Sequence, residues 1–157
     1  RLLKNPYNLK DNFFEKIKII DLIKINFDKF NDNKILSISC NNFEKEYKIF
    51  FKDEINYALG NIIQNSILYS NSKIKIFLEL NEDNFFIKIE DDGTGFAKDV
   101  LDKLGEPYIS KNKKGMGLGI FIAKNLIENM KGEIAFYNSK NNNAIVEIKF
   151  DKAILIL

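Results

Sequence analysis

Histidine is absent from the sequence, and cysteine, arginine and proline are scarce. Without histidine, any chemistry that needs an imidazole must take place on another segment or another chain. The one cysteine, Cys40, excludes a disulfide within the chain and fits a reducing compartment. It lies in the alternating run LSISC, so we expect a strand residue without a redox function. The chain begins with Arg1 and not with Met, and we therefore expect it to be part of a longer protein.

Long apolar runs are also missing. No stretch approaches the roughly 20 residues that span a bilayer, and the first residues do not resemble a signal peptide, so we expect a cytoplasmic domain. The 24 basic and 22 acidic residues nearly cancel, which argues against a nucleic-acid partner. With 157 residues, of which 45% are hydrophobic, the composition predicts a single globular domain over residues 1–157.

Hydrophobic periodicity divides the chain into helices and strands. Helices are expected at 12–24, 53–69, 97–104 and 117–130. Strands are expected at 34–40, 46–51, 73–80, 85–90, 133–138 and 144–150. The first two strands read as a hairpin or as two sequential strands, and the next two read as a hairpin. We expect Asp53 to be the N-cap of its helix and Gly132 to take the left-handed conformation after the last helix.

The strands arrive mainly in pairs, which is typical of a sheet built from antiparallel neighbours. This order favours an α/β (α+β) sandwich, with a mixed, mostly antiparallel sheet and helices packed on one face, over a doubly wound parallel sheet.

A first glycine box, Asp91-Asp92-Gly93-Thr94-Gly95, follows the strand at 85–90. Glycines at alternate positions allow a tight turn and a close approach to a flat ligand, and a carboxylate at the strand end can accept a hydrogen bond from an amine. By itself this pattern is more typical of an ordinary hairpin turn than of a ligand site.

A second glycine box, Gly115-Met116-Gly117-Leu118-Gly119, opens the helix at 117–130. The free N–H groups of a helix N-terminus bind phosphate oxygens, and Lys111, Lys113 and Lys114 just upstream could add positive charge. No strand directly precedes this box and no Gly-Lys-Ser/Thr follows it, so it fits neither a dinucleotide-binding fingerprint nor a P-loop. A surface loop with solvated lysines is the alternative.

A third group lies on the helix at 53–69, where Asn61, Asn65, Leu68 and Tyr69 share a face distinct from the isoleucine stripe. Carboxamide oxygens suit a hard cation such as Mg²⁺, which also holds nucleotide phosphates. In a chain this rich in asparagine, a polar surface is the alternative. The argument for a nucleotide pocket comes from the ordered combination of the three groups.

These residues resemble the GHKL ATPase superfamily, and within it the catalytic ATP-binding (HATPase_c) domains of bacterial sensor histidine kinases. The segments that carry the resemblance are NIIQNSILYS at 61–70, DDGTGF at 91–96, GEPYIS at 105–110 and GMGLG at 115–119. They are similar to that family's N box, G1 box, F-box region and G2 box. The longer strings DDGTGFAKDVLDKLGEPYIS and GMGLGIFIAKNLIE are similar in particular to the redox-responsive Reg/Prr-type kinases.

The resemblance implies a Bergerat-type fold that binds ATP between the asparagine-bearing helix and a lid at 96–116. It implies that Asp91 bonds the adenine amine and that Gly93 and Gly95 shape the adenine pocket. Asn65 would hold Mg²⁺, Asn61 would lie near the γ-phosphate, and these two would be the catalytic residues. The remaining nucleotide contacts would come from Tyr69, Lys111, Lys114, Gly115, Gly117, Leu118 and Gly119.

The same resemblance implies a reaction and its partners. The domain would transfer the γ-phosphoryl group of ATP to a histidine on a dimerisation domain of the same protein, which would pass it to a response regulator receiver domain. The whole protein would be a homodimer, and residues 1–11 would be a remnant of the upstream phosphoacceptor helix.

Two positions bear on rival interpretations. Related hydrolases and serine kinases carry a glutamate base four residues before the metal-binding asparagine, where this chain has Asn61. Many relatives carry a basic residue where this chain has Leu68, so one phosphate contact is missing unless the lysines at 111–114 replace it. Leu68 also leaves open a degenerate module that acts by binding a partner. Ser66, where alanine is commoner, should have no consequence.

Overall fold

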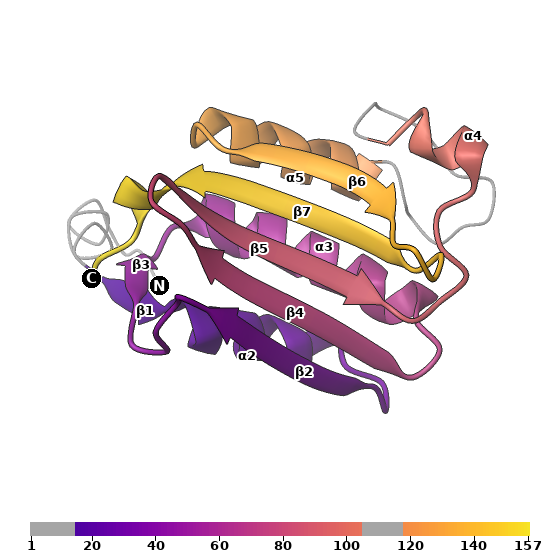
Figure 1. Ribbon diagram of the computed structural model, residues 1–157, viewed down its shortest axis with the longest axis horizontal. Coiled ribbons are helices and arrows are strands. Elements are labelled where there is room, and N and C mark those ends of the chain that lie inside the picture. Colours follow the sequence, from indigo (N-terminus) through magenta and orange to yellow (C-terminus); the bar gives the residue numbers. More distant parts are fainter. Residues whose placement is uncertain (1–14, 105–117) are drawn as a thin grey trace, which may run out of the picture.

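The computed structural model describes residues 15–104 and 118–157. Its main layer is a five-stranded sheet in the order β2-β4-β5-β7-β6 (Figure 1). The strands are β2 (Ile35–Asn41), β4 (Lys73–Leu80), β5 (Asn84–Asp91), β6 (Glu133–Asn138) and β7 (Ala144–Asp151). β2 and β4 are parallel, and every other neighbouring pair is antiparallel.

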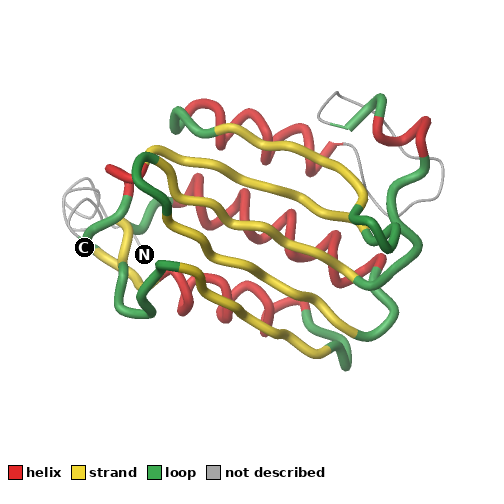
Figure 2. Tube along the Cα trace, viewed as in Figure 1, coloured by secondary structure: helices red, strands yellow, loops and turns green. Residues whose placement is uncertain are grey.

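Three helices form the second layer and cover one face of the sheet (Figure 2). They are α2 (Ile19–Phe30), α3 (Asp53–Tyr69) and α5 (Leu118–Asn129). The mixed sheet with helices on one face confirms the predicted α/β sandwich. Two shorter elements lie at the margins, a sheet of β1 (Lys16–Lys18) with β3 (Lys48–Phe50) and the one-turn helix α4 (Lys98–Leu101), and the 3-10 turn η1 (Lys152–Ile154) follows β7.

The core lies between the sheet and α3. Alternate residues of β4 and β5 point toward the helices and are buried, as the period-two pattern predicts. Facing them, α3 buries the isoleucine stripe predicted for it, namely Ile55, Leu59, Ile62, Ile63 and Ile67. Because this stripe fixes the rotation of α3, the face that carries Asn61 and Asn65 is turned away from the core.

The first helix differs from the prediction for 12–24, since Lys16–Lys18 form a strand and the helix runs from Ile19 to Phe30. Ile17 pairs with Ile49 in the small β1–β3 sheet, so a distant partner decides the local structure. The expected hairpin of the first two strands is also wrong, because β2 pairs with β4 and β3 pairs with β1. Two sequential strands, the alternative, is correct.

Both expected helix caps need correction. The N-cap of α3 is Lys52, without a capping side chain, and Asp53 is the first helical residue. After α5, Lys131 and not Gly132 has the left-handed backbone, with φ 67°. Glycine is needed at 132 for space, because a Cβ there would lie 2.5 Å from the Phe150 ring and 2.9 Å from Ile127.

The helix predicted at 97–104 is shorter, covering only Lys98–Leu101. Cys40 lies in strand β2 as expected, where it is exposed and free. In the described part of the chain, no helix has the length and apolar character needed to cross a membrane. Residues 1–11, expected to be a remnant of an upstream helix, lie outside the described residues.

Candidate functional site

The first glycine box and the end of the asparagine-bearing helix meet at one end of the sheet. There β5 ends at Asp91, α3 ends at Tyr69, and the turn between β6 and β7 lies beside them (Figure 1). The contact is close, since a Cβ added to Gly93 would lie 2.1 Å from the Tyr69 carbonyl oxygen. The first glycine box therefore rests directly on the end of the helix that carries Asn61 and Asn65, and only glycine fits at 93.

Asp91 is a buried carboxylate with spare hydrogen-bonding capacity. It is 5% exposed, and its Oδ1 accepts the Gly93 N–H at 2.9 Å. No donor among the described residues reaches its Oδ2. Burial raises the pKa of Asp91 to about 6; the Gly93 N–H opposes this rise, and the Asp92 and Glu90 carboxylates add to it. A ligand that supplies a hydrogen-bond donor to the Oδ2 would stabilise such a buried carboxylate.

Asp92 has the opposite surroundings. Its carboxylate accepts the backbone N–H groups of Asn71 at 2.8 Å, Ser72 at 3.0 Å and Lys73 at 3.1 Å, and the Ser72 hydroxyl at 2.8 Å. Partial burial alone would raise the pKa of Asp92, but the hydrogen bonds from Ser72, Lys73 and Asn71 outweigh it and lower the pKa to about 2. Asp92 therefore anchors the glycine box to the α3–β4 connection and leaves Asp91 available.

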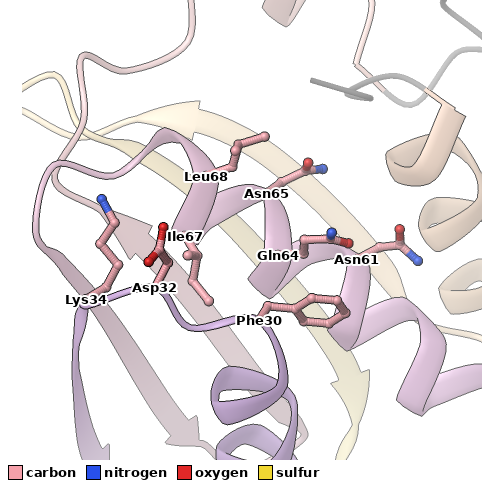
Figure 3. A pocket seen from close by; sticks show the side chains of 8 residues that line it. All are labelled: Phe30, Asp32, Lys34, Asn61, Gln64, Asn65, Ile67 and Leu68. Carbon is pink, nitrogen blue, oxygen red and sulfur yellow. The ribbon is translucent and has the colours of Figure 1, made fainter. Parts of the chain in front are cut away.

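Asn61 and Asn65 project from α3 into a cavity of about 410 Å³ (Figure 3). The Asn61 Nδ2 donates to the Tyr57 carbonyl at 3.0 Å, so its Oδ1 is not used in that hydrogen bond. Within the described residues, the Asn65 carboxamide has no hydrogen-bond partner. The cavity is also lined by Phe30, Asp32, Lys34, Gln64, Ile67 and Leu68. It thus offers neutral oxygen donors beside one cation and one carboxylate.

Gly119, the last residue of the second glycine box, lies against Asn61. A Cβ at Gly119 would lie 2.8 Å from the Asn61 Oδ1, so the start of α5 is in contact with the asparagine face of α3. Leu118, the first residue of α5, is 58% exposed. Asp91 does not line the same cavity; it borders a separate hollow of about 50 Å³. The structure therefore joins Asn61, Asn65 and Gly119 directly, and joins Asp91 to them through α3.

Lys34 is a residue that the sequence analysis missed. Its Nζ donates to the carbonyls of Ser70 and Asn71, each at 3.0 Å, and the side chain lines the cavity beside Leu68. Leu68 itself is 45% exposed. Since an ammonium group has three hydrogens, one remains for a ligand. No local sequence pattern links Lys34 to α3, because it precedes β2 and meets the helix only through the fold.

Several predicted residues lie outside the described part of the chain, namely Lys111, Lys113, Lys114, Gly115 and Gly117. Among the described residues there is no group of three or more histidine, cysteine, aspartate or glutamate side chains that could hold a metal. A cation held by Asn65, water and phosphate oxygens is compatible with the neutral carboxamides, since Mg²⁺ commonly keeps several waters and takes its charge partners from the nucleotide.

The fold and the site define a nucleotide-binding ATPase domain. The family described as histidine kinase-, DNA gyrase B- and HSP90-like ATPase matches residues 52–154, and the chain belongs to this family. Within it, the chain is a catalytic ATPase domain of the sensor histidine kinase type, as the resemblance implied.

Curated relatives and solved structures agree on this type. The chain is 32% identical over 107 residues to the sensor histidine kinase RegB of Cereibacter sphaeroides, covering 61% of this chain and 23% of that protein. It is 27% identical over 145 residues to a putative sensor histidine kinase NtrY-like of Rickettsia prowazekii, covering 88% and 24%. The chain thus spans about a quarter of these relatives.

Among solved structures, the mycobacterial sensor histidine kinase MprB superposes with a TM-score of 0.72 at 14% identity, covering 87% of this chain and 96% of that one. The Acinetobacter baumannii histidine kinase AdeS gives a TM-score of 0.68 at 26% identity, covering 87% and 66%. The first of these supports the fold alone.

Proposed function

We propose that this domain binds ATP with Mg²⁺ and donates the γ-phosphoryl group to a histidine on a dimerisation domain of the same protein. The phosphoryl group would then pass to an aspartate on a response regulator receiver domain, and the whole protein would act as a homodimer. In this proposal residues 96–116 form the ATP lid. The absence of histidine in all 157 residues supports an acceptor on a separate domain.

The observation that carries the proposal is Asn61. It occupies the position where hydrolases of the family need a glutamate, and a carboxamide cannot take a proton from water at neutral pH. Its Oδ1 faces the start of α5, where it can orient the terminal phosphate without activating a nucleophile. Positioning and charge neutralisation supply most of the catalysis in phosphoryl transfer, so such a site remains competent for transfer to a histidine.

The remaining residues take roles that follow from their surroundings. Asp91 would accept a hydrogen bond from the adenine amine, because its Oδ2 has no donor among the described residues. Mg²⁺, held by the Asn65 oxygen, would neutralise charge on the phosphates. Tyr69, Gly115, Gly117, Leu118 and Gly119 would complete the pocket, and the positive charge missing at Leu68 would come from Lys34 or from Lys111, Lys113 and Lys114.

Two other functions, ATP hydrolysis and partner binding without catalysis, are the alternatives to this proposal. Hydrolysis would need a base, and Asp32 is the one carboxylate among the residues lining the cavity; it lies near Lys34, at the far end from Asn61 (Figure 3). A degenerate module that only binds a partner is favoured by Leu68 alone, whose exposed side chain offers no charge to a phosphate.

Phosphoryl transfer tests the proposal. The chain is incubated with γ-labelled ATP, alone and with the dimerisation domain of the same protein. We expect no label on this chain, little free phosphate, and acid-labile label on the added domain. Rapid phosphate release that Asp32→Asn abolishes would establish a hydrolase instead. Binding of the dimerisation domain without binding of ATP would establish the degenerate module.

A further inference from the structure

The end of β6 and the turn between β6 and β7 hold the last two residues of the first glycine box and Phe96, which follows it. The Phe96 N–H donates to the Asn138 Oδ1 at 2.8 Å, and the Asn138 Nδ2 donates to the Phe96 carbonyl at 2.9 Å. One carboxamide therefore satisfies both backbone groups of Phe96, as a neighbouring strand would. The two rings of Phe96 and Phe136 also meet edge to face, with centroids 6.3 Å apart.

Asn142 holds the preceding two residues from the same turn. Its Nδ2 donates to the Thr94 carbonyl at 3.1 Å. Its own carbonyl oxygen lies 2.4 Å from where a Cβ on Gly95 would be, and Gly95 has a left-handed backbone with φ 83°. Gly95 is thus required by the contact with Asn142 as well as by its own conformation.

The β6–β7 turn does not need these three side-chain hydrogen bonds for its own structure. It is closed by Ser139 N–H to the Asn143 carbonyl at 2.8 Å and by Asn142 N–H to the Ser139 carbonyl at 2.9 Å. Asn143 also reaches the Glu90 Oε2 at 3.3 Å and so ties the turn to β5. The carboxamides of Asn138 and Asn142 are therefore directed outward, at the segment that begins with Asp91.

We propose that Asn138 and Asn142 are positioning residues for the adenine end of the pocket, an inference that rests on the proposed function. The segment from Asp91 to Phe96 is held from two sides, by Asp92 on one side and by Asn138 and Asn142 on the other. This segment then has a single conformation before a ligand binds, and the Asp91 Oδ2 has one direction in which to accept the adenine amine. Preorganisation of this kind raises affinity without a new contact to the ligand.

The chain offers a matched control in the same turn. Asn141 is exposed and has no partner among the described residues. Asn141→Ala therefore repeats the chemical change without touching the glycine box. Asn142→Gly removes the bond to Thr94 while keeping the carbonyl and suiting the positive φ of 64°, so it preserves the fold.

The experiment measures affinity for ATP and for inorganic triphosphate by calorimetry, and exchange of the Phe96 amide by NMR. For Asn138→Ala we expect about tenfold weaker ATP binding, triphosphate binding within about twofold of the unsubstituted chain, and faster exchange at Phe96. For Asn142→Gly we expect ATP binding about threefold weaker. Asn141→Ala should leave all three measurements unchanged.

Three outcomes would overturn the inference. ATP binding by Asn138→Ala and Asn142→Gly that equals that of Asn141→Ala would show that the turn needs no positioning. Equal losses for ATP and triphosphate would show a general structural role. If Asn138→Ala does not fold, unchanged ATP binding by Asn142→Gly is the decisive contrary result. An unsubstituted chain that fails to bind ATP would instead defeat the proposed function.

Discussion

At the scale of single residues, the neighbouring carboxylates of Asp91 and Asp92 have different roles in the glycine box. Asp92 accepts four hydrogen bonds within 3.1 Å from the α3–β4 connection, whereas Asp91 accepts one and is buried. Since these hydrogen bonds already occupy the Asp92 carboxylate, Asp92 stabilises the loop and is not available to bind a ligand. Asp91 is left as the group that can recognise a ligand.

Asp91→Asn should weaken ATP binding by roughly tenfold or more, because a charged acceptor is replaced by a carboxamide that must orient one oxygen. Inorganic triphosphate lacks the adenine amine, so its binding should change by no more than about twofold. Calorimetric titration with both ligands measures the difference. Equal losses for ATP and triphosphate would remove Asp91 from the adenine site.

Asp91 should also make stability depend on pH. Its pKa is about 6 in the folded chain and about 3.8 when unfolded. A raised pKa contributes stability that is fully present below pH 3.8 and is lost as the pH rises through 6. Urea unfolding should therefore show that the free energy of unfolding of Asp91→Asn rises relative to that of the unsubstituted chain by about 2 kcal/mol between pH 4 and pH 7. A constant difference across this range would contradict the buried carboxylate.

At the scale of secondary-structure elements, α3 carries core and site on different faces. Its isoleucines pack against the sheet, and Asn61, Asn65 and Leu68 face the cavity. The last turn of α3 has no basic residue, although its carbonyls form the negative end of the helix dipole. Lys34 from outside the helix partly compensates by bonding the Ser70 and Asn71 carbonyls.

Leu68→Lys should therefore raise ATP affinity about two- to fivefold and leave the free energy of unfolding equal or slightly higher. Leu68 is 45% exposed, so the substitution removes little packing. Ile25→Lys on α2, where the residue is 55% exposed, makes the same charge change away from the cavity and is the control. Equal gains from both substitutions would mean that net charge alone, and not a site at Leu68, attracts ATP.

The end of α5 is a second element that can be tested. Gly132→Ala should destabilise the chain by about 1–3 kcal/mol, because the added methyl group would overlap the Phe150 ring. Lys131→Gly should stabilise it by up to about 1 kcal/mol, because Lys131 carries the left-handed backbone. Thermal or urea unfolding measures both. If Lys131→Gly destabilised the chain and Gly132→Ala did not, the left-handed backbone at Lys131 and the close packing at Gly132 would both be contradicted.

At the scale of the whole molecule, the sequence predicted the helices and strands whose hydrophobic period lies within the element itself. The helix at 53–69 was predicted with its correct bounds, because its isoleucines repeat every three or four residues along many turns. β1 was missed because three residues carry no period and depend on pairing with β3. Asn138 and Lys34 were missed for the same reason, since Asn138 meets Phe96 across 42 residues of sequence.

We propose that Asn61, Asn65 and Asp91 form one nucleotide site, with Asn65 as the metal ligand. The decisive measurement is calorimetric titration with ATP, with and without Mg²⁺, of the unsubstituted chain and of Asn65→Ala. We predict that the unsubstituted chain binds ATP more tightly with Mg²⁺, and that Asn65→Ala binds ATP with equal affinity in both conditions. Failure to bind ATP, or a Mg²⁺ dependence that survives in Asn65→Ala, would contradict the account.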